Sequence, residues 1–166
     1  LSQRFTKLPG ARVHRALGRS LFHYPSAERP RLWPKAVAAY EQAYKMWPSN
    51  DLPERFEVLE ETAQALWRAH GYGSDSASTS YGPRAQALLD AAFNDLQLTG
   101  FPVSKARLLR MRGLIAQSLT TKPFHRELEP LRRALGFHEQ ALDACPQDAH
   151  EDRYQILVTL ANALRD

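Results

Sequence analysis

Histidine, glutamate and cysteine side chains could carry chemistry in this chain, but each lacks the neighbours that catalysis or metal binding requires. His138 and Glu139 begin the His-Glu-x-x-His pattern of a zinc-protease helix, and Leu142 stands where the second histidine would be. His125 and Glu127 lie near a proline-bounded helix start, where capping and surface roles are more common than metal ligation. The sequence therefore predicts no metal site.

Cys145 is the single cysteine, which excludes an intrachain disulfide and a zinc site with several cysteines. It precedes Pro146 at a predicted helix end, where the helix dipole disfavours a thiolate, so we expect a packing residue. The sequence also contains no Walker-type phosphate loop and no Gly-x-Ser-x-Gly nucleophile turn. We predict that the protein is not an enzyme and uses no cofactor.

The composition is that of an ordinary globular protein. Of the 166 residues, 43% are hydrophobic and 24% are charged, and the formal net charge is +4. This charge falls short of the strongly basic surface expected of a dedicated nucleic-acid-binding protein. No apolar run is long enough to span a membrane, and no apolar signal segment is seen at the start. The chain begins at Leu1, which predicts a processed or trimmed start, and an intracellular location is favoured, in the cytoplasm or inside an organelle.

Three segments repeat one spacing: an alanine, a larger residue four positions later, a second alanine three further on, and a terminator five further on. The three sets are Ala36, Tyr40, Ala43 and Pro48; Ala85, Leu89, Ala92 and Gln97; and Ala134, His138, Ala141 and Pro146. Successive sets lie about 49 residues apart, which indicates an internal repeat.

A second series of small residues alternates with the first. Gly18, Ala63, Gly113 and Ala161 each stand inside a helical pattern, with an apolar residue three positions later. A glycine inside a helix costs about 1 kcal/mol relative to alanine, so Gly18 and Gly113 predict places where two helices pack closely. The repeating unit is therefore a pair of helices.

Capping residues, prolines and glycines divide the chain into seven predicted helices with no strand. These helices run over about 11–22, 34–48, 51–71, 83–100 and 104–120, from between Pro123 and Pro130 to Pro146, and from His150 to the end. Residues 71–82 are rich in glycine and serine and are predicted to form a loop.

The repeated residues resemble the tetratricopeptide repeat family. The second helix of that family carries Ala–x3–aromatic–x2–Ala–x4–Pro, which Ala36, Tyr40, Ala43 and Pro48 match, and its first helix carries a Leu-Gly pair, which Leu17-Gly18 matches. The resemblance covers nearly the whole chain, although the unit of about 49 residues is longer than the family's roughly 34.

The resemblance implies an all-α solenoid within a single domain over residues 1–166, in which each hairpin shelters the apolar face of the next. The expected hairpins cover about 10–48, 53–97 and 103–146, and a final single helix covers 149–166. Other α-hairpin repeats remain possible because of the long unit.

In the family, the first helix of each hairpin lines a concave groove that binds a partner segment. The residues expected to face this groove are Arg15, Arg19, Glu60, Gln64, Trp67, Arg107 and Arg110. Arginine pairs with carboxylates through two hydrogen bonds, so the groove is expected to bind a partner with acidic character. The family's clamp for acidic chaperone tails is incomplete, because Glu61 and Met111 replace its asparagine and arginine. The alternative is that these arginines form a solvated face.

Two further functions are weighed. The basic stretch from Lys105 to Arg133 could contact RNA phosphates, although the modest net charge argues against it. Trp33, Trp47 and Trp67 could stack on bases, but aromatic residues at helical spacing more often pack in a core. The favoured function is a non-catalytic protein-interaction scaffold. The alternative is a structural subunit of a large multiprotein or ribonucleoprotein assembly, for which an organelle is one candidate location.

Overall fold

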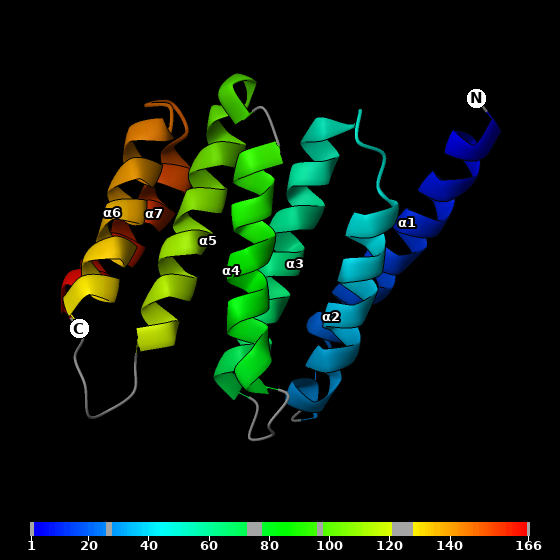
Figure 1. The fold of residues 1–166 in the computed structure, drawn as a ribbon, viewed down its shortest axis with the longest axis horizontal. Coiled ribbons are helices and arrows are strands. Elements are labelled where there is room, and N and C mark those ends of the chain that lie inside the picture. Colours follow the sequence, from blue (N-terminus) through cyan, green and yellow to red (C-terminus); the bar gives the residue numbers. More distant parts are fainter. Residues whose placement is uncertain (1, 26–27, 73–77, 96–97, 121–127, 166) are drawn as a thin grey trace. The chain divides into compact units, whose positions relative to one another are not determined.

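The computed structural model describes residues 2–25, 28–72, 78–95, 98–120 and 128–165. These residues form seven α-helices and one short 3-10 helix, with no strand among them (Figure 1). The α-helices are α1 (Ser2–Phe22), α2 (Arg29–Met46), α3 (Leu52–Tyr72), α4 (Ser78–Asp95), α5 (Pro102–Thr120), α6 (Leu128–Ala144) and α7 (His150–Arg165), and the 3-10 helix is η1 (Leu98–Gly100). The prediction of an all-α chain with seven helices is confirmed.

Contacts between residues divide the chain into two compact units, unit 1 over Leu1–Tyr81 and unit 2 over Gly82–Asp166. The sequence predicted a single repeat domain, and the division falls inside its second predicted hairpin, 53–97. In unit 1, α1 packs along α2 and α2 along α3; in unit 2, α5 packs along α6, and α7 contacts both. Each unit thus contains a helical hairpin followed by a third helix.

Four helices begin earlier than predicted; a proline lies inside three of them, and the other begins with a proline. The first begins at Ser2 and contains Pro9, and the second begins at Arg29 and contains Pro34. The fourth begins at Ser78, ahead of Pro83, so it extends into the predicted loop. The fifth begins at Pro102 instead of Ser104. Proline is tolerated in the first turn, where its missing N–H would have no partner, and helices can extend beyond it when packing compensates.

Apart from the end of the fourth helix, the other predicted boundaries in the described part of the chain agree closely with the structure. The third helix starts at Leu52 with Glu54 in its first turn, the sixth ends at Ala144, and the seventh starts at His150. The fourth ends at Asp95, and η1 follows at Leu98, ahead of the predicted end near Gly100. The residue at Pro123 lies outside the described part of the chain, which resumes with α6 at Leu128.

In unit 1, a glycine allows α1 and α2 to approach closely. A Cβ added to Gly18 would lie 2.9 Å from the ring of Tyr40, and that ring is fully buried. A buried cluster lies beside this contact. Its members are Ala11 of α1, Ala43 of α2, Trp47 directly after α2, and Val58 of α3. The prediction that Gly18 marks a close packing contact is confirmed.

Unit 2 repeats this arrangement in α5 and α6. A Cβ added to Gly113 would lie 2.6 Å from Nε2 of His138, whose side chain is completely buried. Gly113 therefore also marks a close contact, as predicted, and His138 occupies the position that Tyr40 holds in unit 1. A buried cluster from three helices lies in the same unit, and its members are Ala106, Leu109, Ala141, Cys145 and Ile156.

The turns that follow α2 and α6 are also alike. In unit 1 the N–H of Trp47 donates to the carbonyl of Ala43 (2.9 Å), and the guanidinium of Arg55 donates to the carbonyl of Trp47 (2.7 Å). In unit 2 the N–H of Cys145 donates to the carbonyl of Ala141 (3.0 Å), and the guanidinium of Arg153 donates to the carbonyl of Cys145 (2.9 Å). In each turn an arginine of the third helix satisfies a carbonyl that the helix end leaves without an intrahelical partner.

Candidate binding surfaces

The predicted groove arginines of α1 are paired within unit 1. Arg15 donates to both oxygens of Glu61 at 2.8 and 3.0 Å and to Glu57 at 2.7 Å, and its side chain is only 11% exposed. Arg19 also contacts Glu61, through Nε at 3.1 Å and through a shorter contact from Nη2. The guanidinium of Arg15 further lies 5.6 Å from the ring centroid of Trp47. The structure therefore brings Arg15 and Arg19 together, as neighbours on carboxylates of α3.

The protonation of this cluster follows from its contacts. Burial would raise the pKa of Glu61, but hydrogen bonds from Arg15 and Arg19 outweigh burial and lower it below its usual value. Burial would lower the pKa of Arg15, but Glu61 and Glu57 outweigh burial there and raise it. The cluster keeps its charges near neutral pH. Since Arg15 is buried and has two carboxylate partners, we assign it to the α1–α3 contact.

The predicted groove residues of α3 are half-buried. Glu60, Gln64 and Trp67 are each partly accessible, and the guanidinium of Arg68 lies 4.8 Å from the ring centroid of Trp67. The other two tryptophans, Trp33 and Trp47, are buried, as core packing predicts.

Two arginines of the basic stretch of unit 2, Arg107 and Arg112, are also paired with carboxylates within the unit. Arg107 pairs with Asp152 through bonds of 2.6 and 3.2 Å. Arg112 pairs with Asp90 at 2.5 Å, and its half-buried guanidinium lies 4.8 Å from the ring centroid of Phe93 and 4.4 Å from that of Phe137, which are favourable cation–π contacts.

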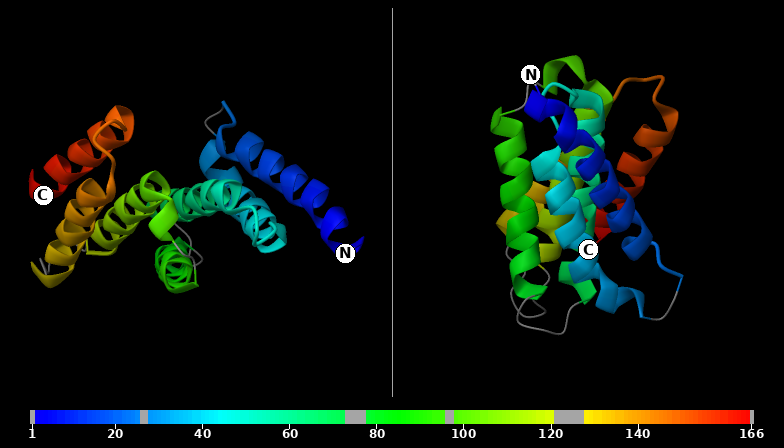
Figure 2. Two further views of the ribbon diagram at one scale, coloured as in Figure 1. Left: turned by 90° about the horizontal axis from the view of Figure 1, so that it is seen from above. Right: turned by 90° about the vertical axis from the view of Figure 1, so that its right-hand side faces the viewer.

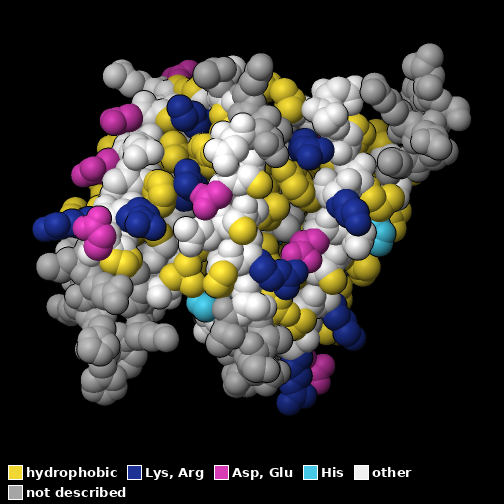
Figure 3. Space-filling model, in the orientation of Figure 1, with side chains coloured by type: hydrophobic (Ala, Val, Ile, Leu, Met, Phe, Trp, Pro, Cys, Tyr) yellow, Lys and Arg dark blue, Asp and Glu magenta, His cyan; other side chains and the backbone are white. Residues whose placement is uncertain are grey.

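Arg110 is half-buried. The pKa of His138 is lowered to about 4, mainly by the burial of its ring and further by the positive charge of Arg110. Among the described residues visible in Figure 3, lysine and arginine side chains are spread out with acidic side chains between them. On the face seen in Figure 3, these side chains form no continuous basic stripe of the kind that follows a phosphate backbone.

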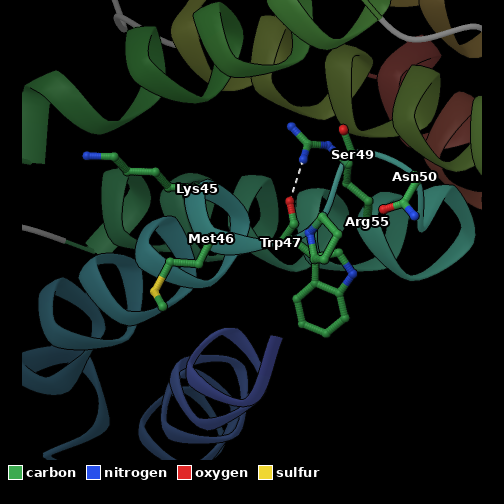
Figure 4. Close-up of a pocket in the computed structure, with 7 residues that line it drawn as sticks. Lys45, Met46, Trp47, Ser49, Asn50 and Arg55 are labelled. Atoms are coloured by element: carbon green, nitrogen blue, oxygen red, sulfur yellow. Dashed lines mark hydrogen bonds between the residues drawn. The ribbon is translucent and has the colours of Figure 1, made fainter. Parts of the chain in front are cut away.

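A small pocket lies at the turn between α2 and α3, with a volume of about 240 Å³. Figure 4 shows the guanidinium of Arg55 reaching the carbonyl of Trp47 beside it. Nε of Arg55 and Nε1 of Trp47 are buried there without a hydrogen-bond partner in the described structure. The pocket is smaller than the roughly 300 Å³ at which ligand pockets usually begin. Since Arg153 makes the same carbonyl contact in unit 2, we assign Arg55 to closing the turn.

Among the described residues of unit 2, the large apolar side chains that are exposed lie on α7, a surface that the sequence did not predict. Tyr154 is 61% exposed, Leu157 47%, Val158 39% and Leu164 67%. These residues lie on the side of the helix opposite to Ile156, Thr159 and Ala163, which are buried. In Figure 2 (left), α7 is drawn in red, with α5 and α6 on one side of it only.

The corresponding residues of α3 provide the contrast. Phe56, Leu59 and Leu66 hold the positions of Tyr154, Leu157 and Leu164, two repeat periods earlier, and all three are buried. The same helix face is thus covered in α3 and open in α7. The sequence signal was present, because Tyr154, Leu157, Ala161 and Leu164 follow the three-and-four spacing of a helix contact stripe.

Two negative findings concern metal binding and membrane spanning in the described ranges. No group of three or more His, Cys, Asp or Glu side chains there is placed to hold a metal ion. None of the described helices is long and apolar enough to cross a membrane. Comparisons of the chain with protein-family models, curated proteins and solved structures find no significant match.

Proposed function

We propose that this chain is a non-catalytic protein-binding scaffold, a divergent tetratricopeptide-like array of helical hairpins that contacts a partner protein through the exposed face of α7. The observation that carries the proposal is the stripe of Tyr154, Leu157, Val158 and Leu164 on that helix. Large apolar side chains gathered on one helix face are typical of protein contact sites.

The array interpretation is supported by contacts that recur in the two units. Gly18 lies under the ring of Tyr40, and Gly113 lies under the ring of His138. Six residues before each glycine, an arginine also approaches a matching carboxylate: Arg12 lies 3.9 Å from Glu54 in unit 1, and Arg107 lies 2.6 Å from Asp152 in unit 2. Recurring contacts of this kind are expected when one hairpin is repeated along a chain.

A structural subunit of a larger assembly is the second candidate. It is favoured by a second apolar exposure on α1, where Val13 is 66% and Leu17 is 48% exposed. A subunit held between two neighbours would use one exposed face for each of them. A scaffold that binds through α7 alone does not require the α1 face.

Site-specific photo-crosslinking tests the proposal. A benzoyl-phenylalanine at Tyr154 is expected to form an adduct with a protein chain in a cell extract, because its ring would lie inside the contact. The matched position is Gln140, which is exposed on α6. Adducts at both positions alike, or at neither, would contradict a contact through α7. For the second candidate, adducts at Val13 as well as at Tyr154 are expected.

A further inference from the structure

We infer that the partner of α7 is a second copy of this chain, and that the two α7 helices pack side by side and antiparallel about a twofold axis. The inference rests on the proposed function and names its partner. Most symmetric pairs of identical chains use one self-complementary patch in this way.

The apolar stripe has the spacing of a helix–helix seam. Tyr154, Leu157, Ala161 and Leu164 follow one another at intervals of three, four and three residues, and all four are exposed. This alternation is the spacing that lets two helices interdigitate along two heptads. In an antiparallel pair the large Tyr154 meets Leu164 of the other copy, and Leu157 meets the small Ala161.

The charges beside the stripe select the antiparallel direction. Glu151 in the first turn and Arg165 in the last turn are exposed, and each lies seven residues from Val158 along the same flank of the stripe. Antiparallel packing brings Glu151 of each copy beside Arg165 of the other, so the favourable pair forms twice. Parallel packing would place like charges at the same end. The antiparallel arrangement also opposes the two helix dipoles.

The charged side chains next to Glu151 make contacts within their own unit, so they do not compete for its pairing with Arg165 of the other copy. Asp152 is held by Arg107 at 2.6 Å, and Arg153 is bonded to the turn that follows α6. Glu151 accepts a hydrogen bond from Gln155 on its own helix at 3.0 Å, an exposed contact that a stronger charge pair can replace. A seam of two heptads is shorter than most permanent interfaces, so we expect a dissociation constant on the order of micromolar.

Reversing the charges of Glu151 and Arg165 is the sharpest test of the antiparallel contact. Light scattering over a concentration series is expected to show a mass rising toward twice the 18.8 kDa of one chain. Glu151→Arg and Arg165→Glu should each weaken association about tenfold or more, because each places two like-charged pairs across the seam. The double variant, or a mixture of the two single variants, should recover the pair.

Two further variants separate loss of contact from loss of folding. Leu157→Glu should remove the dimer, while Gln140→Glu on α6 should leave it unchanged. Slow reaction of the buried Cys145 with thiol reagents checks that unit 2 remains folded in every variant. Val158→Cys should form a disulfide-linked dimer on oxidation, because Val158 meets its own counterpart near the axis.

The possible outcomes decide the inference separately from the proposed function. If the chain stays monomeric up to high micromolar concentration and a crosslinker at Tyr154 captures a different protein, the inference that the partner is a second copy is wrong. The proposed protein-binding function then stands. A monomer with no adduct at Tyr154 overturns both. A dimer that neither charge exchange nor Leu157→Glu affects overturns the placement of the contact on α7.

Discussion

Units 1 and 2 share one construction but differ in the ring that covers the glycine of the first helix. In unit 1 the ring is Tyr40, and burial together with the charge of Glu61 raises the pKa of its hydroxyl, so it stays neutral. In unit 2 the ring is His138, whose two nitrogens are buried with no hydrogen-bond partner in the described structure. Burial and the charge of Arg110 lower the pKa of His138 to about 4. The position thus holds a flat ring in both units, and the chemistry of that ring decides how the unit responds to pH.

The arginine–carboxylate pairs Arg15–Glu61 in unit 1 and Arg107–Asp152 in unit 2 differ in how far the arginine is buried. Removing the more buried arginine should have the largest effect on stability. We expect Arg15→Ala to destabilise unit 1 by about 3 kcal/mol, because it leaves the half-buried charge of Glu61 with Arg19 as its remaining arginine partner. Arg107→Ala should cost unit 2 less, about 1–2 kcal/mol, because the Arg107 side chain is 41% exposed and water can take its place beside the 18%-exposed side chain of Asp152.

Urea unfolding measures the two arginine variants separately. All three tryptophans lie in unit 1, and the single cysteine lies in unit 2. Tryptophan fluorescence therefore reports unit 1, and thiol accessibility reports unit 2. Equal effects of the two substitutions would show that burial does not distinguish the pairs.

The glycine contacts are expected to have the next largest effect. Alanine normally stabilises a helix interior by about 1 kcal/mol relative to glycine. At Gly18 and Gly113 the added methyl would overlap a ring, so Gly18→Ala and Gly113→Ala should instead destabilise their units by about 1–3 kcal/mol.

Gly136 in α6 is the matched control for these substitutions. An added Cβ there has no neighbour within 4 Å, so Gly136→Ala should leave stability unchanged or raise it. Thermal unfolding of the three variants gives the comparison. A stabilising Gly113→Ala would mean that α5 and α6 are not in close contact at this position.

The turn arginines should have the smallest effect and should match each other. Arg55→Ala and Arg153→Ala each remove a charge-assisted bond to a helix-end carbonyl, and we expect each to cost about 1 kcal/mol in its own unit. Arg55 also lies 4.7 Å from the ring centroid of Tyr44, and Arg153 donates a second bond to the carbonyl of Leu142 at 3.3 Å, so the two losses should be similar. The two probes described above measure both losses. A large loss in one unit alone would contradict the equivalence of the turns.

Much of the fold could be predicted from the sequence, because the informative residues act locally or at a fixed period. Pro48 and Pro146 marked helix ends, and Gly18 and Gly113 marked close contacts. The early helix starts escaped prediction, because a proline near a helix start can open the helix or lie inside it, and packing decides between the two.

The candidate binding surface was harder to predict, because pairing and exposure are tertiary properties. Arg15 and Arg107 have the sequence spacing of groove residues, but only the fold shows that they pair with Glu61 and Asp152. Likewise, Leu59 of α3 and Leu157 of α7 hold matching positions in the repeat, yet one is buried and the other exposed. Sequence periodicity predicts that a face is apolar, but it does not say whether another element covers it.

The difference between the rings predicts different acid sensitivity in the two units. His138 accepts a proton readily only when unit 2 is unfolded, where its pKa returns to about 6.5, so unfolding takes up a proton between pH 6.5 and 4. The stability of unit 2 therefore falls as the pH falls through this range, by about 2 kcal/mol at pH 5. Glu61 keeps its charge at pH 5 because its pKa is lowered, so unit 1 loses nothing through this carboxylate.

The central claim, one shared construction with a different ring in each unit, is tested most directly by urea unfolding at pH 7 and pH 5 with both probes. Dithiodipyridine, which reacts with thiols at acid pH, follows Cys145, and fluorescence follows the tryptophans. We expect the thiol midpoint to drop at pH 5, the tryptophan midpoint to stay in place, and His138→Leu to abolish the drop. A common shift of both midpoints, or a drop that persists in His138→Leu, would contradict the account.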